Sequence, residues 1–146
     1  MTGQTVSASV EISASPGQVW HALTDPDLIS EYFFGTRVET TWEPGSPITW
    51  SGEYDGRSYQ DKGEVLEVEQ EKLLVVTHFS PLTGQDDVPE NYHRLTYRLD
   101  DEGDKTRVTL EQDNTPEGSV EEFRTNWETV LGSLKELVES GRHGME

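Results

Sequence analysis

Cysteine is absent from this chain of 146 residues. The protein therefore cannot form disulfides, use a thiol nucleophile or bind zinc through thiolates. No apolar run approaches the roughly 20 residues that span a bilayer, and we expect no membrane contact. The first fifteen residues lack the basic region and the apolar core of a signal peptide, which predicts a cytoplasmic protein.

Basic residues are also scarce, with 11 Lys and Arg against 29 Asp and Glu and a formal net charge of −18. Nucleic acid binding depends on cationic contacts to phosphate, so we expect no nucleic acid partner. The glycines form no phosphate-binding motif, and no cofactor is expected. Only 32% of the residues are hydrophobic, yet they are regularly spaced, which indicates one folded domain over residues 1–146.

Alternating apolar and polar residues predict a half-buried strand over residues 6–12. Two short helices should follow, because Ser15 and Asp25 each precede a proline in the pattern of a capped helix start. Turn signals then separate further short segments with strand character. These strands are expected at residues 48–50, 63–69, 73–79, 91–99 and 106–114.

A final helix of about 24 residues is predicted from apolar residues spaced three and four apart. It should start near Thr115 or Ser119, either of which could cap it. A meander of hairpins buries one face of its sheet, and only this helix is long enough to cover that face. The sequence therefore predicts an α+β, helix-grip fold: a curved antiparallel sheet around a long C-terminal helix, with two short helices after the first strand. The apolar residues of the helix are Val120, Phe123, Trp127, Val130, Leu131, Leu134, Leu137 and Val138.

The residues of the inner sheet face follow from two hairpins, because directly opposed residues share a face. One loop can pair His78 with His93, and the acidic turn can pair Asp100 with Lys105. The second pairing places Tyr97 opposite Val108, Leu95 opposite Leu110, and His93 opposite Gln112. Both hairpins then give the same apolar face, formed by Leu74, Val76, Leu95, Tyr97, Val108 and Leu110.

One end of this face is polar, with His78, His93 and Gln112. These groups either meet water at the rim or orient the polar part of a ligand in an apolar pocket. Farther back, pairing through Asp55 and Gly56 puts Trp50 opposite Asp61, out of phase with Leu66 and Val68. A bulge near Gly63 would restore the alternation.

Several ordered motifs resemble the AHSA-like family, the homologues of the heat-shock-protein-90 ATPase activator in the SRPBCC superfamily. The clearest is V-W-H-A-L-T-D-P at residues 19–26. Others are Y-F-F-G at 32–35, W-E-P-G at 42–45 and G-E-V-L-E-V at 63–68, and the match continues through residues 126–135. The resemblance implies a START-like fold with a cavity between sheet and helix, and it implies no fixed catalytic set.

The function expected from these observations is binding of a small hydrophobic or amphipathic molecule, without evident catalysis. One alternative is a small enzyme of polyketide cyclase or dehydratase type, with His78, His93 or Tyr97 as acid or base. The other is a chaperone-related or other protein-interaction module, with a protein partner or a homodimer. A metal site at His78 and His93, with Glu64 as a third ligand, is conceivable because imidazole suits zinc, but no metal is expected. The expected cavity lining is Leu74, Val76, His78, His93, Leu95, Tyr97, Leu110, Gln112, Phe123, Trp127, Val130 and Leu131.

Overall fold

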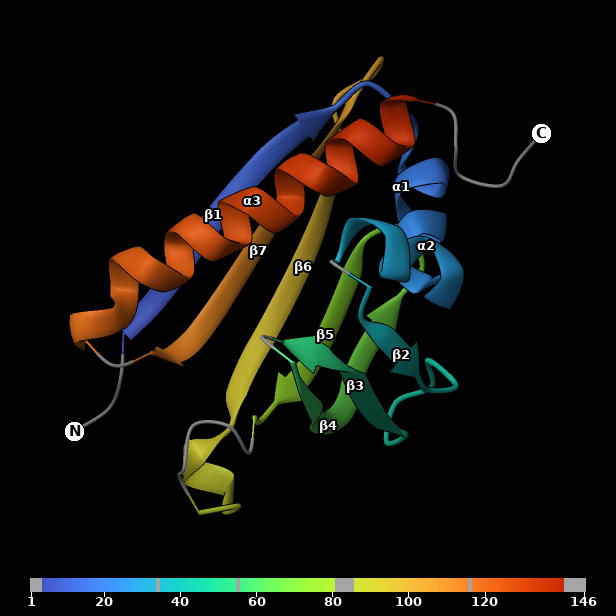
Figure 1. Cartoon of the computed structure of the whole chain (residues 1–146). Helices are drawn as coiled ribbons and strands as arrows, with labels where there is room; N and C mark the ends of the chain where they lie inside the picture. Colours follow the sequence, from blue (N-terminus) through green and yellow to red (C-terminus); the bar gives the residue numbers. More distant parts are fainter. Residues whose placement is uncertain (1–3, 34, 55, 81–85, 116, 141–146) are drawn as a thin grey trace.

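Seven antiparallel strands form one curved sheet in the order β1-β7-β6-β5-β4-β3-β2. The computed structural model describes residues 4–33, 35–54, 56–80, 86–115 and 117–140. A long helix, α3, crosses β1 and β7, while two short helices lie at one end beside β2 (Figure 1). The predicted helix-grip α+β fold is confirmed. The elements are β1 (Gln4–Ile12), α1 (Pro16–Thr24), α2 (Pro26–Tyr32), β2 (Arg37–Glu39), β3 (Pro47–Tyr54), β4 (Arg57–Glu69), β5 (Leu73–His78), η2 (Pro89–Asn91), β6 (His93–Asp101), β7 (Thr106–Thr115), η3 (Glu117–Ser119) and α3 (Val120–Glu139).

The starts of the two short helices are as predicted. Ser15 Oγ accepts from the Gln18 backbone N–H at 3.3 Å, and the Gln18 side chain accepts from the Ser15 N–H at 3.2 Å. Asp25 Oδ1 accepts from the backbone N–H groups of Asp27 and Leu28, at 2.9 and 3.4 Å. These bonds satisfy N–H groups that a helix start leaves free.

The start of α3 differs from the prediction. The helix has 20 residues and begins at Val120, and Ser119 makes no side-chain capping bond. Thr115 belongs to β7 instead and is fully buried. Its hydroxyl accepts a hydrogen bond from Gln112 Nε2 at 2.9 Å, so it serves the inner face and not the helix.

The registers confirm one hairpin and correct the other. His78 pairs with His93, Val76 with Leu95, and Leu74 with Tyr97, as predicted. The pairing of β6 with β7 was wrong by two residues, because Asp101 lies opposite Thr106. The turn has the predicted length but lies one residue further along the chain: Glu102 N–H donates to Lys105 O at 2.8 Å, and Gly103 has a φ of 94°.

This shift changes partners without changing faces. Tyr97 now lies opposite Leu110, and Leu95 lies opposite Gln112. Side chains alternate with a period of two, so a slip of two residues leaves each one on its original side of the sheet. The predicted apolar face therefore survives the register error.

A register irregularity in β4 explains the phase of the third hairpin. Trp50 pairs with Asp61 as predicted, although Asp55 lies outside the described residues. The pairing of β4 with β5 shifts between Val65 and Glu67, a little beyond Gly63. Inward positions therefore change from odd to even numbers, and Asp61, Val65 and Val68 all lie on the core side of the sheet.

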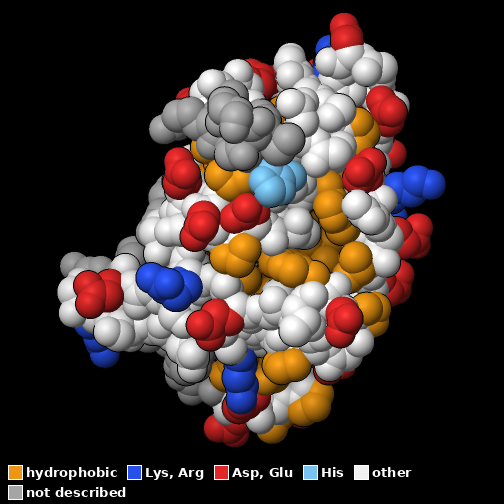
Figure 2. All heavy atoms as spheres, turned by 90° about the vertical axis from the view of Figure 1, so that its right-hand side faces the viewer, with side chains coloured by type: hydrophobic (Ala, Val, Ile, Leu, Met, Phe, Trp, Pro, Cys, Tyr) orange, Lys and Arg blue, Asp and Glu red, His pale blue; other side chains and the backbone are white. Residues whose placement is uncertain are grey.

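The core lies between the sheet and α3. Leu131 and Leu134 of α3 belong to one buried cluster with Val108 and Leu110 of β7. Trp127, one helical turn earlier, is only half-buried against that cluster. No helix in the described part of the chain is long and apolar enough to cross a membrane. Over the face formed by α1, α2 and β2, acidic side chains outnumber basic ones around an apolar centre (Figure 2).

Candidate functional site

A carboxylate and an imidazole meet on the inner face where β4 and β5 lie side by side. His78 Nε2 is 2.8 Å from Asp61 Oδ2, and the two side chains are 22% and 16% exposed. A carboxylate only accepts, so Nε2 carries the hydrogen and donates it. In a neutral imidazole this leaves Nδ1 as an acceptor. Asp61 Oδ1 and His78 Nδ1 are buried and have no hydrogen-bond partner among the described residues.

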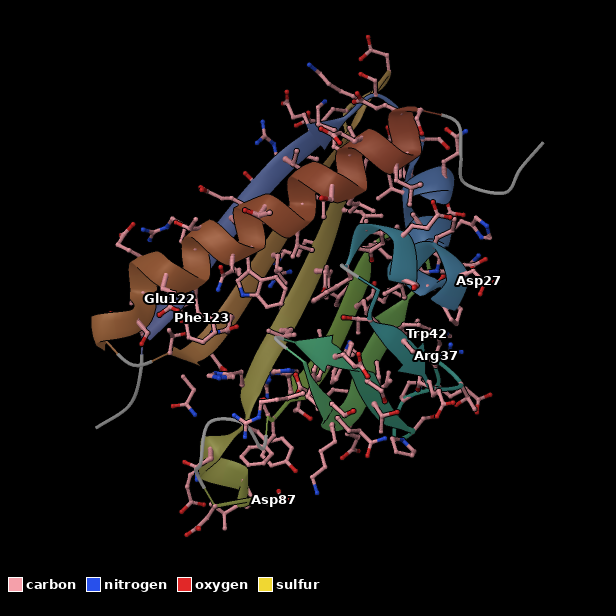
Figure 3. All side chains as sticks on the ribbon, viewed as in Figure 1. Asp27, Arg37, Trp42, Asp87, Glu122 and Phe123 are labelled. Atoms are coloured by element: carbon pink, nitrogen blue, oxygen red, sulfur yellow. The ribbon has the colours of Figure 1, made fainter. Side chains whose placement is uncertain are left out.

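His93 lies next to this pair. Its ring stacks on that of His78 with centroids 6.2 Å apart, and it contacts the Phe123 ring at 5.8 Å. Phe123 lies near the start of α3, close to the end of the sheet (Figure 3). His93 Nδ1 donates to the Asp113 backbone oxygen at 3.0 Å. Burial lowers the pKa of His93, and the bond to Asp113 opposes this effect without overcoming it.

The lowered pKa of His93 predicts an acid-sensitive contribution to stability. Below the ordinary histidine pKa of about 6.5, the unfolded chain takes up a proton more readily than the folded chain at this position. The contribution of His93 should therefore be present above about pH 6.5 and be lost as the pH falls below it. Urea unfolding at about pH 8 and pH 5.5 should show that the free energy of unfolding falls less on acidification in His93→Gln than in the wild type. An equal or larger loss in the variant would contradict this assignment.

Gln112 has a structural role in the polar end of the face. Trp127 Nε1–H donates to Gln112 Oε1 at 2.9 Å, and Gln112 Nε2 donates to Thr115 Oγ1 at 2.9 Å. Gln112 is 1% exposed. The Oε1 end of the amide therefore holds α3 on β7, while the Nε2 end is bonded within β7.

Two small cavities lie between the sheet and the helices. One, of about 40 Å³, is lined by Asp61 and His78 together with five aromatic rings, one of them from α3. The other, of about 20 Å³, is lined mainly by aliphatic and aromatic side chains of β2, β3, β5, β6, α1 and α2. Such volumes suit a water-sized group, whereas ligand pockets typically measure about 300–1,000 Å³. The five rings of the first cavity are Phe33, Trp50, Tyr59, Tyr97 and Trp127.

Aromatic side chains separate and close these cavities. Phe33, Trp50 and Tyr97 line both of them. Phe33 packs edge-on against Trp127 with centroids 6.1 Å apart, and Trp50 packs edge-on against His78 at 5.0 Å. Movement of these rings would join the two cavities into one longer space.

A larger depression of about 530 Å³ lies at the other end of the sheet. It is formed by the β4–β5 turn and the end of β6, with Glu69, Lys72, Arg98 and Asp101 among its lining residues. None of the Asp61, His78 and His93 side chains lines it. Its volume reflects a surface hollow between charged side chains, so we place the candidate site at the smaller, buried cavities.

The predicted lining residues divide into two groups. The cavities are lined by Leu74, Val76, His78, Leu95, Tyr97 and Trp127. The others pack around the cavities without lining them: His93, Leu110, Gln112, Phe123, Val130 and Leu131. Val130 and Leu131 are 5% and 1% exposed and belong to the core.

Asp61 was missed as a site residue. The predicted pairing with Trp50 contained the signal, but the bulge was needed to show that both face inward. Glu64, weighed as a metal ligand, is exposed, and Asp61 is the carboxylate that reaches His78. No group of three or more metal-ligating side chains occurs within the described ranges. Phe33 and Tyr59 were also missed, since neither lay in a segment assigned to the inner face.

A curved sheet closed by a C-terminal helix, with an inward polar cluster, defines a START-like protein of the SRPBCC superfamily. The chain belongs to the family described as "Activator of Hsp90 ATPase homolog 1-like protein", whose model matches residues 13–139. This confirms the family resemblance seen in the sequence. No match was found among curated proteins.

Solved structures share this fold over nearly the whole chain. The solution structure of ChR145 from Cytophaga hutchinsonii is 39% identical, with a TM-score of 0.84 and 97% and 98% of the two chains covered. CalU16 from Micromonospora echinospora is 23% identical, with a TM-score of 0.74 over 97% of this chain and 81% of the other. The Aha1 dimer from Colwellia psychrerythraea is 20% identical, with a TM-score of 0.74 over 94% and 98%. The last two similarities concern the fold alone.

Proposed function

We propose that this protein binds a small hydrophobic or amphipathic molecule between the sheet and α3, with the polar part of the ligand at Asp61 and His78. The observation that supports this most directly is a pair of buried acceptors, without partners among the described residues, in a largely aromatic wall. A buried polar group without a partner costs about 1–3 kcal/mol. A ligand that supplies hydrogen bonds there would recover this free energy.

Binding of anything larger than a few atoms requires the aromatic rings to move. Phe33 follows α2 directly, and its ring is half-buried, so it can swing away with less loss of packing than a core residue. Displacing Phe33 from Trp127 would open the 40 Å³ cavity toward the outside. We therefore expect ligand binding with induced opening, slower than binding to a preformed pocket.

Two-dimensional NMR of the tryptophan indole N–H groups tests this function. The four tryptophans report on different places in the protein. Trp50 and Trp127 line the 40 Å³ cavity, whereas Trp20 lines neither of the two small cavities. During titration with neutral aromatic probes such as naphthalene or benzyl alcohol, the Trp50 and Trp127 signals should shift and the Trp20 signal should stay. A library of apolar and aromatic probes that moves no indole signal, or moves only that of Trp20, would exclude the proposed site.

Catalysis is a second candidate function, favoured by the orientation of His78. A carboxylate that accepts from Nε2–H stabilises an imidazolium, so Nδ1 could take a proton from a bound molecule. A solved structure of similar fold is of a protein from the dynemicin biosynthetic locus. If His78 acts in catalysis, a molecule that the wild type converts should be bound by His78→Gln without being converted. Mass spectrometry of the molecule recovered from each protein shows whether it has been converted.

A protein partner or a homodimer, and a cytoplasmic location, stay predictions. The Colwellia psychrerythraea structure is of a dimer. Sedimentation velocity of the purified chain would show whether this chain self-associates.

A further inference from the structure

The two unpartnered atoms at the site share one chemical property. Asp61 Oδ1 is a carboxylate oxygen, and in the neutral imidazole His78 Nδ1 is the nitrogen without a hydrogen, because Nε2–H is donated to Asp61. Both atoms are hydrogen-bond acceptors. A group that satisfies them must therefore bring at least two hydrogens on one small polar centre.

The charge of the site has one sign. Asp61 accepts a hydrogen bond from His78, and no Lys or Arg pairs with it in the part of the chain that the structure describes. With a neutral imidazole, the pair carries one negative charge at side-chain exposures of 16% and 22%. Burying an uncompensated charge is costly, so a cation is the group that gains most here. The net charge of −18 also favours approach of cations over anions.

The walls around the carboxylate are aromatic. Phe33, Trp50, Tyr59, Tyr97 and Trp127 line the same cavity as Asp61 and His78. Aromatic faces attract cations, most strongly where water is excluded. The same rings can pack on the apolar body of a ligand. The hydroxyl of Tyr59 is bonded to Thr36 Oγ1 at 2.8 Å, which leaves its ring as its contribution to the wall.

We propose that this site binds an organic amine in its ammonium form, with N–H hydrogens directed at Asp61 and His78 and an apolar or aromatic body among the rings. The inference rests on the ligand-binding function proposed above and adds the class of ligand. A carboxylate ligand would be repelled by Asp61, and a quaternary ammonium would leave both acceptors without hydrogens. A neutral alcohol would supply one hydrogen and no charge.

A set of four probes on one ring tests the proposal: benzylamine, benzyl alcohol, benzyltrimethylammonium and benzoate. Affinities are measured by the indole NMR titration at neutral pH and constant salt. Benzylamine should bind roughly tenfold or more tighter than benzyl alcohol and benzyltrimethylammonium, because charge-assisted hydrogen bonds are about twice as strong as neutral ones. Benzoate should be the weakest of the four.

The variant Asp61→Asn removes the charge and keeps the shape of the side chain. It should weaken benzylamine by roughly tenfold or more and change benzyl alcohol by about twofold at most. The matched control is Glu67→Gln, which removes one exposed charge from the same strand and should leave both affinities unchanged. If Asp61→Asn does not fold, the comparison of the four probes on the wild type decides alone.

The outcomes separate this inference from the general one. If benzylamine and benzyl alcohol bind equally, or the quaternary ion equals the amine, the amine assignment is wrong and ligand binding stands. If benzyl alcohol binds and benzylamine does not, the amine assignment is again wrong and ligand binding stands. If no probe binds, charged or neutral, both proposals are wrong.

Discussion

Replacing Gly63 with alanine should lower the free energy of unfolding by roughly 3 kcal/mol or more. A Cβ at this position would lie 1.8 Å from the Thr77 backbone oxygen and 2.5 Å from its carbonyl carbon. Both atoms belong to the neighbouring strand, so the clash can be relieved only by moving β4 and β5 apart. Urea unfolding followed by circular dichroism measures the loss.

Gly132→Ala is the control, with the opposite sign expected. Gly132 lies within α3, and a Cβ there would meet nothing within 4 Å. Alanine should stabilise the helix by about 0.5–1 kcal/mol, because it costs less backbone entropy than glycine. If the free energy of unfolding of Gly63→Ala is within about 1 kcal/mol of the wild-type value, the close approach of the two strands does not constrain this position.

The second large effect concerns Trp127. Trp127→Ala should cost about 2–3 kcal/mol, somewhat below the usual value of about 3–5 kcal/mol for a fully buried tryptophan. The ring is half-buried and borders a cavity, so part of its surface makes no packing contact. Its removal also leaves Gln112 Oε1, which accepts from Nε1 at 2.9 Å, without that donor. Chemical denaturation of the purified variant measures the change.

Trp127→Phe separates the two causes. It keeps an aromatic ring and removes only the donor, so its cost should be about 1–2 kcal/mol from the unpartnered amide oxygen. Trp127→Ala should always be the more destabilising of the two. A Trp127→Ala variant as stable as the wild type would show that α3 is not held to β7 through this contact.

The fold was predictable because a register error of two residues changes which residues are paired but leaves each side chain on the same face of the sheet. The β6–β7 register was wrong by two residues, yet Tyr97 and Leu110 still lie on the predicted side. The two short helices were predictable from Ser15 and Asp25, since capping is a local interaction. The start of α3 was less predictable, because Thr115 could cap a helix or end a strand, and its pairing with Gln4 of β1 places it in the strand.

The candidate site was predictable only in part. His78 and His93 pair as expected, but the carboxylate partner of His78 depends on the irregularity between Val65 and Glu67. A bulge changes which residues face inward, and no single residue in that segment marks its position. The size of the cavity was also beyond the sequence, because a pattern of apolar residues does not specify how closely their side chains fill the space.

The position of β1 affects the order in which the chain can fold. This strand leaves the ribosome before the other strands of the sheet, yet it pairs with β7, and the ion pair between Arg107 and Glu11 joins residues 96 positions apart. β1 therefore has no sheet partner until β7 has been synthesised. Such distant pairing slows folding and leaves an unpaired strand edge exposed meanwhile. One side of the unpaired β1 segment would stay polar, because serines stand at positions 7, 9 and 13 and a glutamate at position 11. This polar side would discourage association between nascent chains.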